Sequence, residues 1–374
     1  MSWSYWLCDT ITGDKLLEVE PASGSWSRLL NISGSGRHTF VPGALDADGD
    51  RLIDRATWRD ATTPWACTLV QCWDDVPVYA GVITGRPYDR DTQMLTLNHT
   101  DLRSLFTARF TFGAVYWEDE DAGIPGHLTI TSKSLVSAVG LVLQNACITP
   151  VGFTTDYSVP LVLPSLVESG TYTNRIDNFN FVKVTDFLSE LQEMDGGPDV
   201  EFAPQWSGSD KLEWVVRAGG LTGGTFDFDL SDPACPVSSA RFTEDALKQV
   251  TGVIGIGEGF GAEIVAGGQT VAQQSDAEIP ARDEVVPWRM VKSIPYAASL
   301  ATGRLATYKY PTTQPALTVL ASEVSPLDLV LGSIVTVTDS GDPFLLDGPT
   351  EYRLVGLSGG VGLEVQLSVQ EVHA

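Results

Sequence analysis

An alternating apolar pattern between residues 73 and 110 constrains the fold more than any other part of the sequence. Every second residue of one run is apolar: Val76, Val78, Ala80 and Val82. This period of two is typical of a strand with one buried face. The turn-rich segment 85–91 follows, and the alternation of Leu95 and Leu97 predicts a returning strand. The unit therefore reads as a strand, a turn and a second strand.

A short helix is expected to close this unit. Asp101 can cap it, because Leu102, Leu105 and Phe106 fall on one side of a helix that begins there. Strand, turn, strand and helical cap together carry no catalytic pattern. We interpret them as a building block of a small β-barrel.

The end of the chain repeats this arrangement. An aromatic-led strand over 351–357, a Ser-Gly-Gly turn and a strand over 363–369 form the predicted final hairpin. In the last strand Leu363, Val365, Leu367 and Val369 alternate with polar residues, the cleanest strand pattern in the sequence. Too few residues are identical for a sequence repeat. The shared order of elements still predicts two similar barrels in one chain.

Length and composition predict several domains rich in strands. With 374 residues the chain exceeds one ordinary core, and 36 Gly and 21 Pro spread along it predict many turns between short strands. We expect a first β-barrel over residues 1–110, an acidic α+β middle domain over 111–250 and a second β-barrel over 251–374. The predicted fold class is β-rich α+β, with two small antiparallel β-barrel modules and a middle domain with two helices.

The middle domain holds two helical patterns. Ser132 can cap a helix from Lys133 to about Cys147. The stripe Val184, Phe187, Leu188 and Leu191 predicts a helix over about 184–194, which Gly196, Gly197 and Pro198 end. The polar and aromatic segment 174–181 is expected to be a loop. Further along, a third helix is predicted from Ala297 to about Tyr308.

Charge excludes several classes of partner. The formal net charge is −25, and residues 111–250 alone hold 7 Lys+Arg against 20 Asp+Glu. Such a surface repels phosphate, which argues against sequence-specific or tight binding of nucleic acid and against anionic membranes. The acidity either serves solubility or lines a channel past which DNA slides.

Cysteines and the N-terminus exclude other classes. The thiols of Cys8, Cys67, Cys72, Cys147 and Cys235 are too few and too scattered for a disulfide framework, and we interpret them as small buried apolar residues. The first ten residues lack a basic region before an apolar run, which predicts no signal peptide. The longest apolar run, 135–143, is too short for a membrane span.

Two glycine-rich motifs invite a catalytic or cofactor interpretation. Residues 356–360 match the G-x-S-x-G nucleophile elbow, but a strand follows rather than a helix, and a hairpin turn is the preferred interpretation. Glycines at 252, 255, 257, 259 and 261 approach a dinucleotide loop, but Phe260 breaks the spacing from Gly255, and no βαβ pattern surrounds a start at Gly257. We expect a turn-rich loop there.

Metal ligands and paired carboxylates give no specific pattern. Asp46, Asp48 and Asp50 form a carboxylate cluster that fits either a solvated loop or a weak Ca²⁺ site, since it lacks the Gly and Glu of an EF-hand. The histidines, His38, His99, His127 and His373, have no metal-binding spacing. Pairs of carboxylates that could cleave glycans occur by chance among 48 acidic residues. We therefore predict no catalytic, cofactor-binding or metal residues, no cofactor and no enzymatic activity.

Several segments resemble the minor tail proteins of long-tailed phages that infect actinobacteria, and through them the baseplate or tail-tip hub proteins of tailed phages. They are the unit at 73–110, the opening 5–31, which includes Ser-Trp-Ser-Arg-Leu-Leu-Asn, the segment 186–199 (Asp-Phe-Leu-Ser-Glu-Leu-Gln-Glu-Met-Asp-Gly-Gly-Pro-Asp) and the strand at 331–337. Segment 186–199 is the most specific. Many relatives carry further C-terminal domains, whereas this sequence stops after the second predicted barrel.

This resemblance implies a virion protein at the tail tip, assembled in the host cytoplasm. It implies a homotrimer in which three copies of two tail-tube-like barrels offer six units to a sixfold tube. The implied partners are the tail tube or distal tail protein, the tape measure protein and other tail-tip or fibre proteins, with DNA only in transit and no membrane. The alternatives are a hexameric distal tail ring protein, and a tail protein that binds or hydrolyses host-wall carbohydrate.

Overall fold

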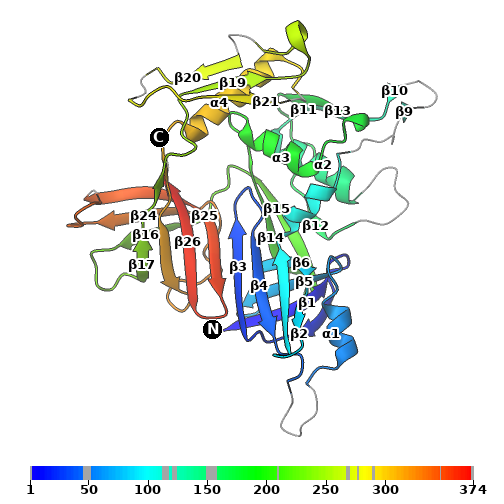
Figure 1. Cartoon of the computed structure of the whole chain (residues 1–374), viewed down its shortest axis with the longest axis vertical. Coiled ribbons are helices and arrows are strands. Elements are labelled where there is room, and N and C mark those ends of the chain that lie inside the picture. The colour runs from blue at the N-terminus through cyan, green and yellow to red at the C-terminus, as the bar shows by residue number, and fades with distance from the viewer. Residues whose placement is uncertain are drawn as a thin grey trace.

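The structure is a computed structural model that describes residues 2–44, 52–111, 118–119, 124–148, 158–208, 210–266, 270–275, 278–288, 291–345 and 347–371. Two groups of strands lie side by side, and helices and short sheets cover them at one end (Figure 1). The predicted β-rich α+β class is confirmed at this level. Among the described helices, none is both long and apolar enough to span a lipid bilayer.

The first β-module comprises the strands before residue 101. They are β1 (Trp3–Asp9), β2 (Lys15–Glu18), β3 (Ser23–Leu29), β4 (Ser35–Phe40), β5 (Cys67–Trp73), β6 (Val76–Gly85), β7 (Tyr88–Asp89) and β8 (Met94–Thr100), with helix α1 (Arg55–Ala61) and the 3-10 helix η1 (Leu102–Ala108). Their order in the sheet is β3-β4-β8-β6-β5-β1-β2. The predicted strand-turn-strand-helix unit is present as β6, β8 and η1. Asp101 precedes η1, but its carboxylate accepts the Gly34 amide at 2.6 Å instead of capping the helix.

Both faces of the central strands of this module are buried, which corrects the prediction of a half-buried strand. In β5, Cys67 and Leu69 point into a core with Phe40 and Trp58, whereas Val70 and Cys72 join the core of the middle region. The alternating residues therefore separate two cores rather than a core from solvent. Val76, the first residue of the predicted pattern, is exposed.

The second β-module takes strands from both sides of residue 250. It comprises β16 (Thr225–Asp229), β17 (Val237–Arg241), β23 (Ala316–Leu320), β24 (Ile334–Asp339), β25 (Gly348–Gly360) and β26 (Glu364–Glu371). Strand β16 pairs in parallel with β24, and β17 pairs with β23. These pairings cross the predicted boundary at residue 250, and the division into three domains stays a prediction.

The final hairpin has the predicted alternation except at Leu363, which precedes β26 and is 45% exposed. Val365, Leu367 and Val369 of β26 are fully buried in one core, and Glu364 and Gln366 on the opposite face are exposed. The glycine-rich residues 356–360 lie within the long strand β25, and the turn comes after them. Our prediction that these residues form the turn was wrong, because the sheet continues through them.

The two β-modules belong to a single 14-stranded sheet. Strand β3 of the first module pairs with β25 of the second, and the two groups are thereby continuous (Figure 1). Among the described strands, no pairing joins β2 back to β3, or β17 back to β16, so neither module closes on itself. The closed-barrel form is not confirmed. The edge of β3 that would have to pair with β2 to close the first module pairs with β25 of the second module instead.

The middle region covers the first β-module. It comprises β9 (Glu118–Asp119), β10 (Ile124–Pro125), β11 (His127–Lys133), α2 (Leu135–Leu143), the π-helical turn η2 (Gln144–Ile148), β12 (Leu161–Val162), β13 (Tyr172–Asp177), η3 (Asn178–Asn180), α3 (Val184–Glu193), β14 (Asp199–Ser207) and β15 (Lys211–Gly219). Helix α3 buries the four predicted apolar residues. The cap of α2 is Ser134 rather than Ser132, and segment 174–181 holds the end of strand β13 and the 3-10 helix η3 rather than a loop.

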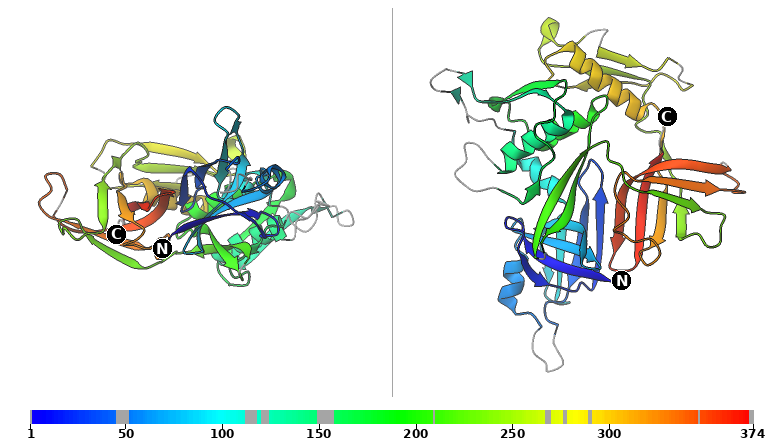
Figure 2. Two further views of the ribbon diagram at one scale, coloured as in Figure 1. Left: turned by 90° about the horizontal axis from the view of Figure 1, so that it is seen from below. Right: turned by 180° about the vertical axis from the view of Figure 1, so that it is seen from behind.

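A smaller unit completes the end of the molecule away from the sheet. It comprises β19 (Gly252–Ile256), η4 (Gly261–Glu263), β20 (Val271–Gln273), β21 (Asp283–Pro287) and α4 (Ile294–Tyr308). The two-residue strands β18 (Glu244–Asp245) and β22 (Thr312–Thr313) pair with each other next to β26 and connect this unit to the second β-module. Helix α4 begins three residues before the predicted start. It packs on β19 and against α3, which fixes this unit to the middle region (Figure 2).

Candidate functional site at the seam between the modules

The seam, which we define as the pairing of β3 residues 25–29 with β25 residues 356–360, joins the two β-modules. Trp26 lies opposite Gly359, and Leu29 lies opposite Gly356. A Cβ added at Gly356 would lie 2.7 Å from Cδ2 of Leu29, and one at Gly359 would lie 3.1 Å from Nε1 of Trp26. The glycines of β25 therefore let the large side chains of β3 lie against the partner strand.

An aromatic cluster locks one end of the seam. Trp26 is buried, and its ring lies beside those of Trp3 and Tyr79. Trp3 also contacts Trp73 edge-on, with ring centroids 4.8 Å apart, and its Nε1 donates to the carbonyl of Gly362 at 2.7 Å. Aromatic pairs of this geometry contribute about 0.5–1.5 kcal/mol beyond burial. The N-terminal strand is thereby attached to the last hairpin of the second module.

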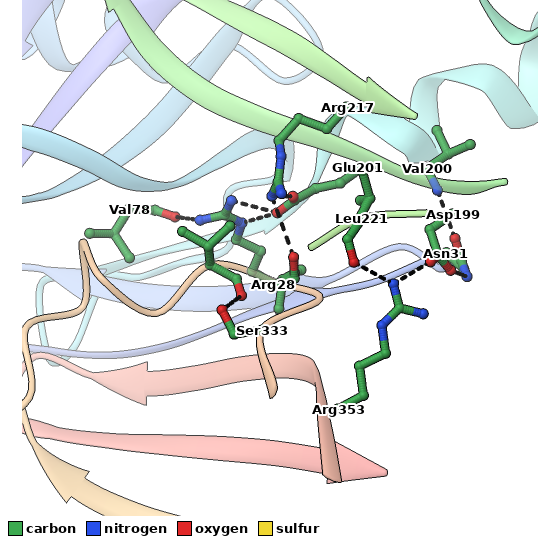
Figure 3. Close-up of polar contacts among 12 residues, drawn as sticks. Arg28, Asn31, Val78, Asp199, Val200, Glu201, Arg217, Leu221, Ser333 and Arg353 are labelled. Carbon is green, nitrogen blue, oxygen red and sulfur yellow. Dashed lines mark hydrogen bonds and ion pairs between the residues drawn. The ribbon is translucent and has the colours of Figure 1, made fainter. Parts of the chain in front are cut away.

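Glu201 of β14 ties the middle region to the seam. This side chain is almost fully buried and contacts two arginines (Figure 3). Arg28 of β3 donates from Nε at 2.6 Å, and Arg217 of β15 donates from Nη1 at 2.5 Å. Arg28 also donates to the carbonyl of Val78 at 3.2 Å. A buried carboxylate needs such paired donors, because isolation from water would otherwise cost several kcal/mol.

A second ion pair extends the contact into the second module. Asp199 of β14 pairs with Arg353 of β25, which also donates to the carbonyl of Leu221 at 2.8 Å. Asn31, just after β3, donates to Asp199 at 2.7 Å and accepts the amide of Val200 at 2.8 Å. Asn31 has a φ of 68°, a left-handed conformation that asparagine tolerates better than most residues. We call Arg28, Asn31, Asp199, Glu201, Arg217 and Arg353 the seam network.

A chain of buried polar groups lies in the first β-module. His38 Nδ1 and His99 Nε2 are 2.9 Å apart, and His99 Nδ1 is 2.9 Å from the hydroxyl of Tyr79. Burial lowers the pKa of His38 to about 4 and that of His99 to about 3, with the neighbouring His38 a further cause for His99. Burial also raises the pKa of Tyr79 well above its usual value. All three side chains are buried, so this row of hydrogen-bonded groups stabilises the core and cannot contact a substrate.

The motifs considered from the sequence do not come together into a catalytic site. Strand β26 follows residues 356–360, so the helix that a nucleophile elbow requires is not in that place. Residues 252–256 form β19, and the next described helical element is the three-residue η4 rather than a helix of a βαβ unit. Asp46, Asp48, Asp50 and His373 lie outside the described residues.

Metal ligands and thiols also remain dispersed. Within the described ranges, no three His, Cys, Asp or Glu side chains gather in a way that could hold a metal ion. The five cysteines are free thiols; four are buried as expected, and Cys235 is partly exposed. Burial raises the pKa of the Cys8, Cys72 and Cys147 thiols to about 12, which keeps them protonated and unreactive.

Sequence reasoning did not single out the seam network. Arg28 and Asn31 lie in the opening segment and Asp199 ends segment 186–199, so two of the segments quoted for the phage resemblance meet here. Glu201 sits between Val200 and Phe202 in β14, and an acid flanked by apolar residues there is the one signal that could have indicated a buried pair.

Comparison with known proteins identifies similar folds but no similar sequences. No protein-family model matches the sequence, and no curated protein matches it at a significant level. Among solved structures, the 43 kDa tail protein of prophage MuSo2 from Shewanella oneidensis aligns with a TM-score of 0.58 and 14% identity over 98% of each chain. A tail protein from Neisseria meningitidis aligns with a TM-score of 0.53 and 12% identity over 99% of this chain and 97% of that one. At such identities, what is established is the fold, and this chain has the fold of phage tail proteins along nearly its whole length.

Proposed function

We propose that this protein is a structural tail hub of a tailed phage, a trimer that caps the tail tube and passes DNA at ejection. The observation that carries the proposal is the seam. It unites two β-modules of one chain in a continuous sheet, and the alignment to tail proteins runs through both modules and the middle region.

Trimerisation would explain why one chain carries two β-modules. Three copies would present six β-modules to a sixfold tube, in which each module is one unit of the ring. The seam network supports this, because it holds the two modules and the covering hairpin β14–β15 in one orientation. Among the described strands, β16 and β17 each pair on one side only, so pairing between copies would bury their remaining backbone groups.

The acidic surface supports passage of DNA without binding. The net charge of −25 disfavours contact with a phosphate backbone, so a lumen lined by this surface would let DNA slide. We propose the tail tube or distal tail protein, the tape measure protein and other tail-tip or fibre proteins as partners. The resemblance of the opening and of segment 186–199 supports an actinobacterial host. We further propose that the protein has no enzymatic activity.

The mass of the purified assembly tests the stoichiometry. Light scattering or native mass spectrometry on the full chain should give three copies. Six copies would instead support a hexameric distal ring protein, and one copy at every concentration would contradict a ring. Release of sugars from host cell wall, measured with the same preparation, would contradict the proposal that the protein is not an enzyme.

A further inference from the structure

A pocket of about 560 Å³ opens in the first β-module, between α1 and the turn that contains β7. Its lining includes four arginines: Arg55, Arg59, Arg86 and Arg90. Helix α1 lies on the side of this module away from the second β-module in both views, so the pocket is remote from the seam (Figures 1 and 2). The structural role proposed above does not use it.

The two walls of the pocket supply the arginines in pairs. Arg55 and Arg59 are one turn apart on α1 and share a face of the helix. Arg86 and Arg90 flank β7 on the opposite wall. Arg86 also fastens the walls together, since its Nη1 donates to the carbonyl of Arg59 at 2.5 Å and lies 3.3 Å from the hydroxyl of Thr62.

No ion pair neutralises these four guanidinium groups among the residues that the structure describes. Four aspartates lie beside them in the sequence: Asp60 and Asp91 form no ion pair with them in the described part of the chain, and Asp54 and Asp89 are engaged with backbone amides instead. Asp54 accepts the amides of Ala56 and Thr57 at the start of α1, and Asp89 accepts those of Asp91 and Thr92. The cations therefore face the pocket with free donor capacity.

This concentration of positive charge is unusual for such an acidic chain. Residues 1–110 hold 10 Lys+Arg, and four of these line one pocket. Like charges held close together repel, and an anion among them removes the repulsion. Planar guanidinium groups bind carboxylates through paired hydrogen bonds, so the lining fits a carboxylate-bearing ligand.

The rest of the lining fits a peptide. Trp58 and Leu95 are buried and form an apolar floor, and Tyr88 is 55% exposed at the rim. Among the described strands, β7 pairs with β8 alone, which leaves its other edge open to an extended chain. An extended peptide places alternate side chains on one face, and two carboxylates spaced in this way can reach both pairs of arginines.

We propose that this pocket binds an acidic, extended peptide segment of a partner protein. A short segment carries few charges and is only weakly repelled by the acidic surface elsewhere. A nucleic acid carries a charge at every phosphate and meets that surface along its length, so we favour the peptide. This inference is independent of the trimer and holds for any oligomeric state.

Fluorescence anisotropy with the full-length protein tests the proposal. The probe is a labelled peptide in which glutamate alternates with glycine, compared with the same peptide carrying glutamine. The test variant is R59Q/R90Q, which spares the bridging Arg86. Its matched control is R37Q/R241Q, which removes two exposed arginines outside the pocket lining. Circular dichroism melts establish that both variants fold.

We expect the glutamate peptide to bind the parent and the control variant alike at low salt, and the test variant at least about tenfold more weakly. Equal weakening in both variants would reduce the effect to net charge and overturn the proposal. So would equal binding of the glutamine peptide, or no binding of the glutamate peptide. Single-stranded DNA could instead bind more tightly than the peptide and lose this binding in R59Q/R90Q. That result would show that the pocket binds phosphate groups and would contradict the proposed peptide ligand.

Discussion

The two β-modules bury their central strands in different ways. In the first module, β6 has both faces covered, because the middle region packs on the face that a lone sheet would expose to water. In the second module, β26 buries alternate residues in one core and exposes those between. The same order of elements thus serves as the inside of a three-layer arrangement in one case and as an open sheet in the other. The difference is set by what covers the sheet.

The largest effect should come from a charge on the covered face of the first module. We expect Val82→Asp to destabilise folding by about 5 kcal/mol or to prevent it, because the carboxylate would enter the shared core without a partner. Gln366→Asp on the exposed face of β26 should stay within about 0.5 kcal/mol. Urea denaturation of both variants checks this. Equal effects would contradict the contrast between the modules.

The next effect concerns the seam network. Glu201→Gln should cost about 3 kcal/mol, since Arg28 and Arg217 would lose their buried counter-charge. The control is Glu213→Gln on β15, whose carboxylate binds Gln205 in an exposed pair. Chemical denaturation should separate the two variants clearly. A Glu201→Gln protein as stable as the control would mean that the network does not hold the modules together.

The buried histidines make the first module the more sensitive one to acid. Their pKa values in the fold, about 4 and 3, lie below the ordinary value near 6.5. As the pH falls below 6.5, the unfolded chain binds protons at these histidines before the folded protein does. The free energy of unfolding that the neutral histidines contribute above pH 6.5 is therefore lost as the pH falls toward 4 and 3. Burial raises the pKa of Asp101 to about 6, and that single carboxyl opposes the trend.

We expect His99→Gln to be less stable than the parent at pH 7, with a gap in unfolding free energy that narrows by about 3 kcal/mol at pH 4 because the variant no longer has this group to protonate. Gln366→Asn, at an exposed position on β26 that has no titratable group, serves as the control and should keep a constant gap. Thermal melts from pH 7 to pH 4 give the comparison. A constant gap for His99→Gln would show that its imidazole does not govern the acid response.

The smallest effect should come from the seam glycine. Gly356→Val should cost about 1 kcal/mol, because Leu29 must shift to admit the new side chain. Gly362→Ala lies in open space in the following turn and should cost almost nothing. Hydrogen exchange should speed up at the amides of β3 and β25 in the first variant alone. Unchanged exchange there would mean that the seam tolerates added bulk.

The sequence predicted an element correctly where neighbouring residues determine it, and less well where packing against distant parts of the chain determines it. Helix α3, with its apolar stripe and the Gly-Gly-Pro stop, and strand β26, with its alternation, follow from neighbouring residues and were predicted. Whether both faces of β6 are buried depends on a hairpin more than a hundred residues later in the chain, and no local pattern reveals that. Helix α1 escaped prediction because its seven residues include three charged ones and no apolar stripe.

The candidate sites were harder to predict than the elements. Direct contacts in the seam network join side chains up to 173 positions apart, and the sequence offered only Asp199 and Glu201 beside the apolar residues of β14. The arginine pocket gathers residues from a helix and a turn that are separated by β5 and β6. A net charge of −25 gives no indication that four arginines line one pocket.

Electron microscopy of the purified assembly, viewed down its symmetry axis, tests the central claim most directly. The account predicts three copies around a central opening, with six β-modules of similar outline that alternate between the first and second module of each chain. A ring of six copies, or a compact particle without an opening, would contradict it.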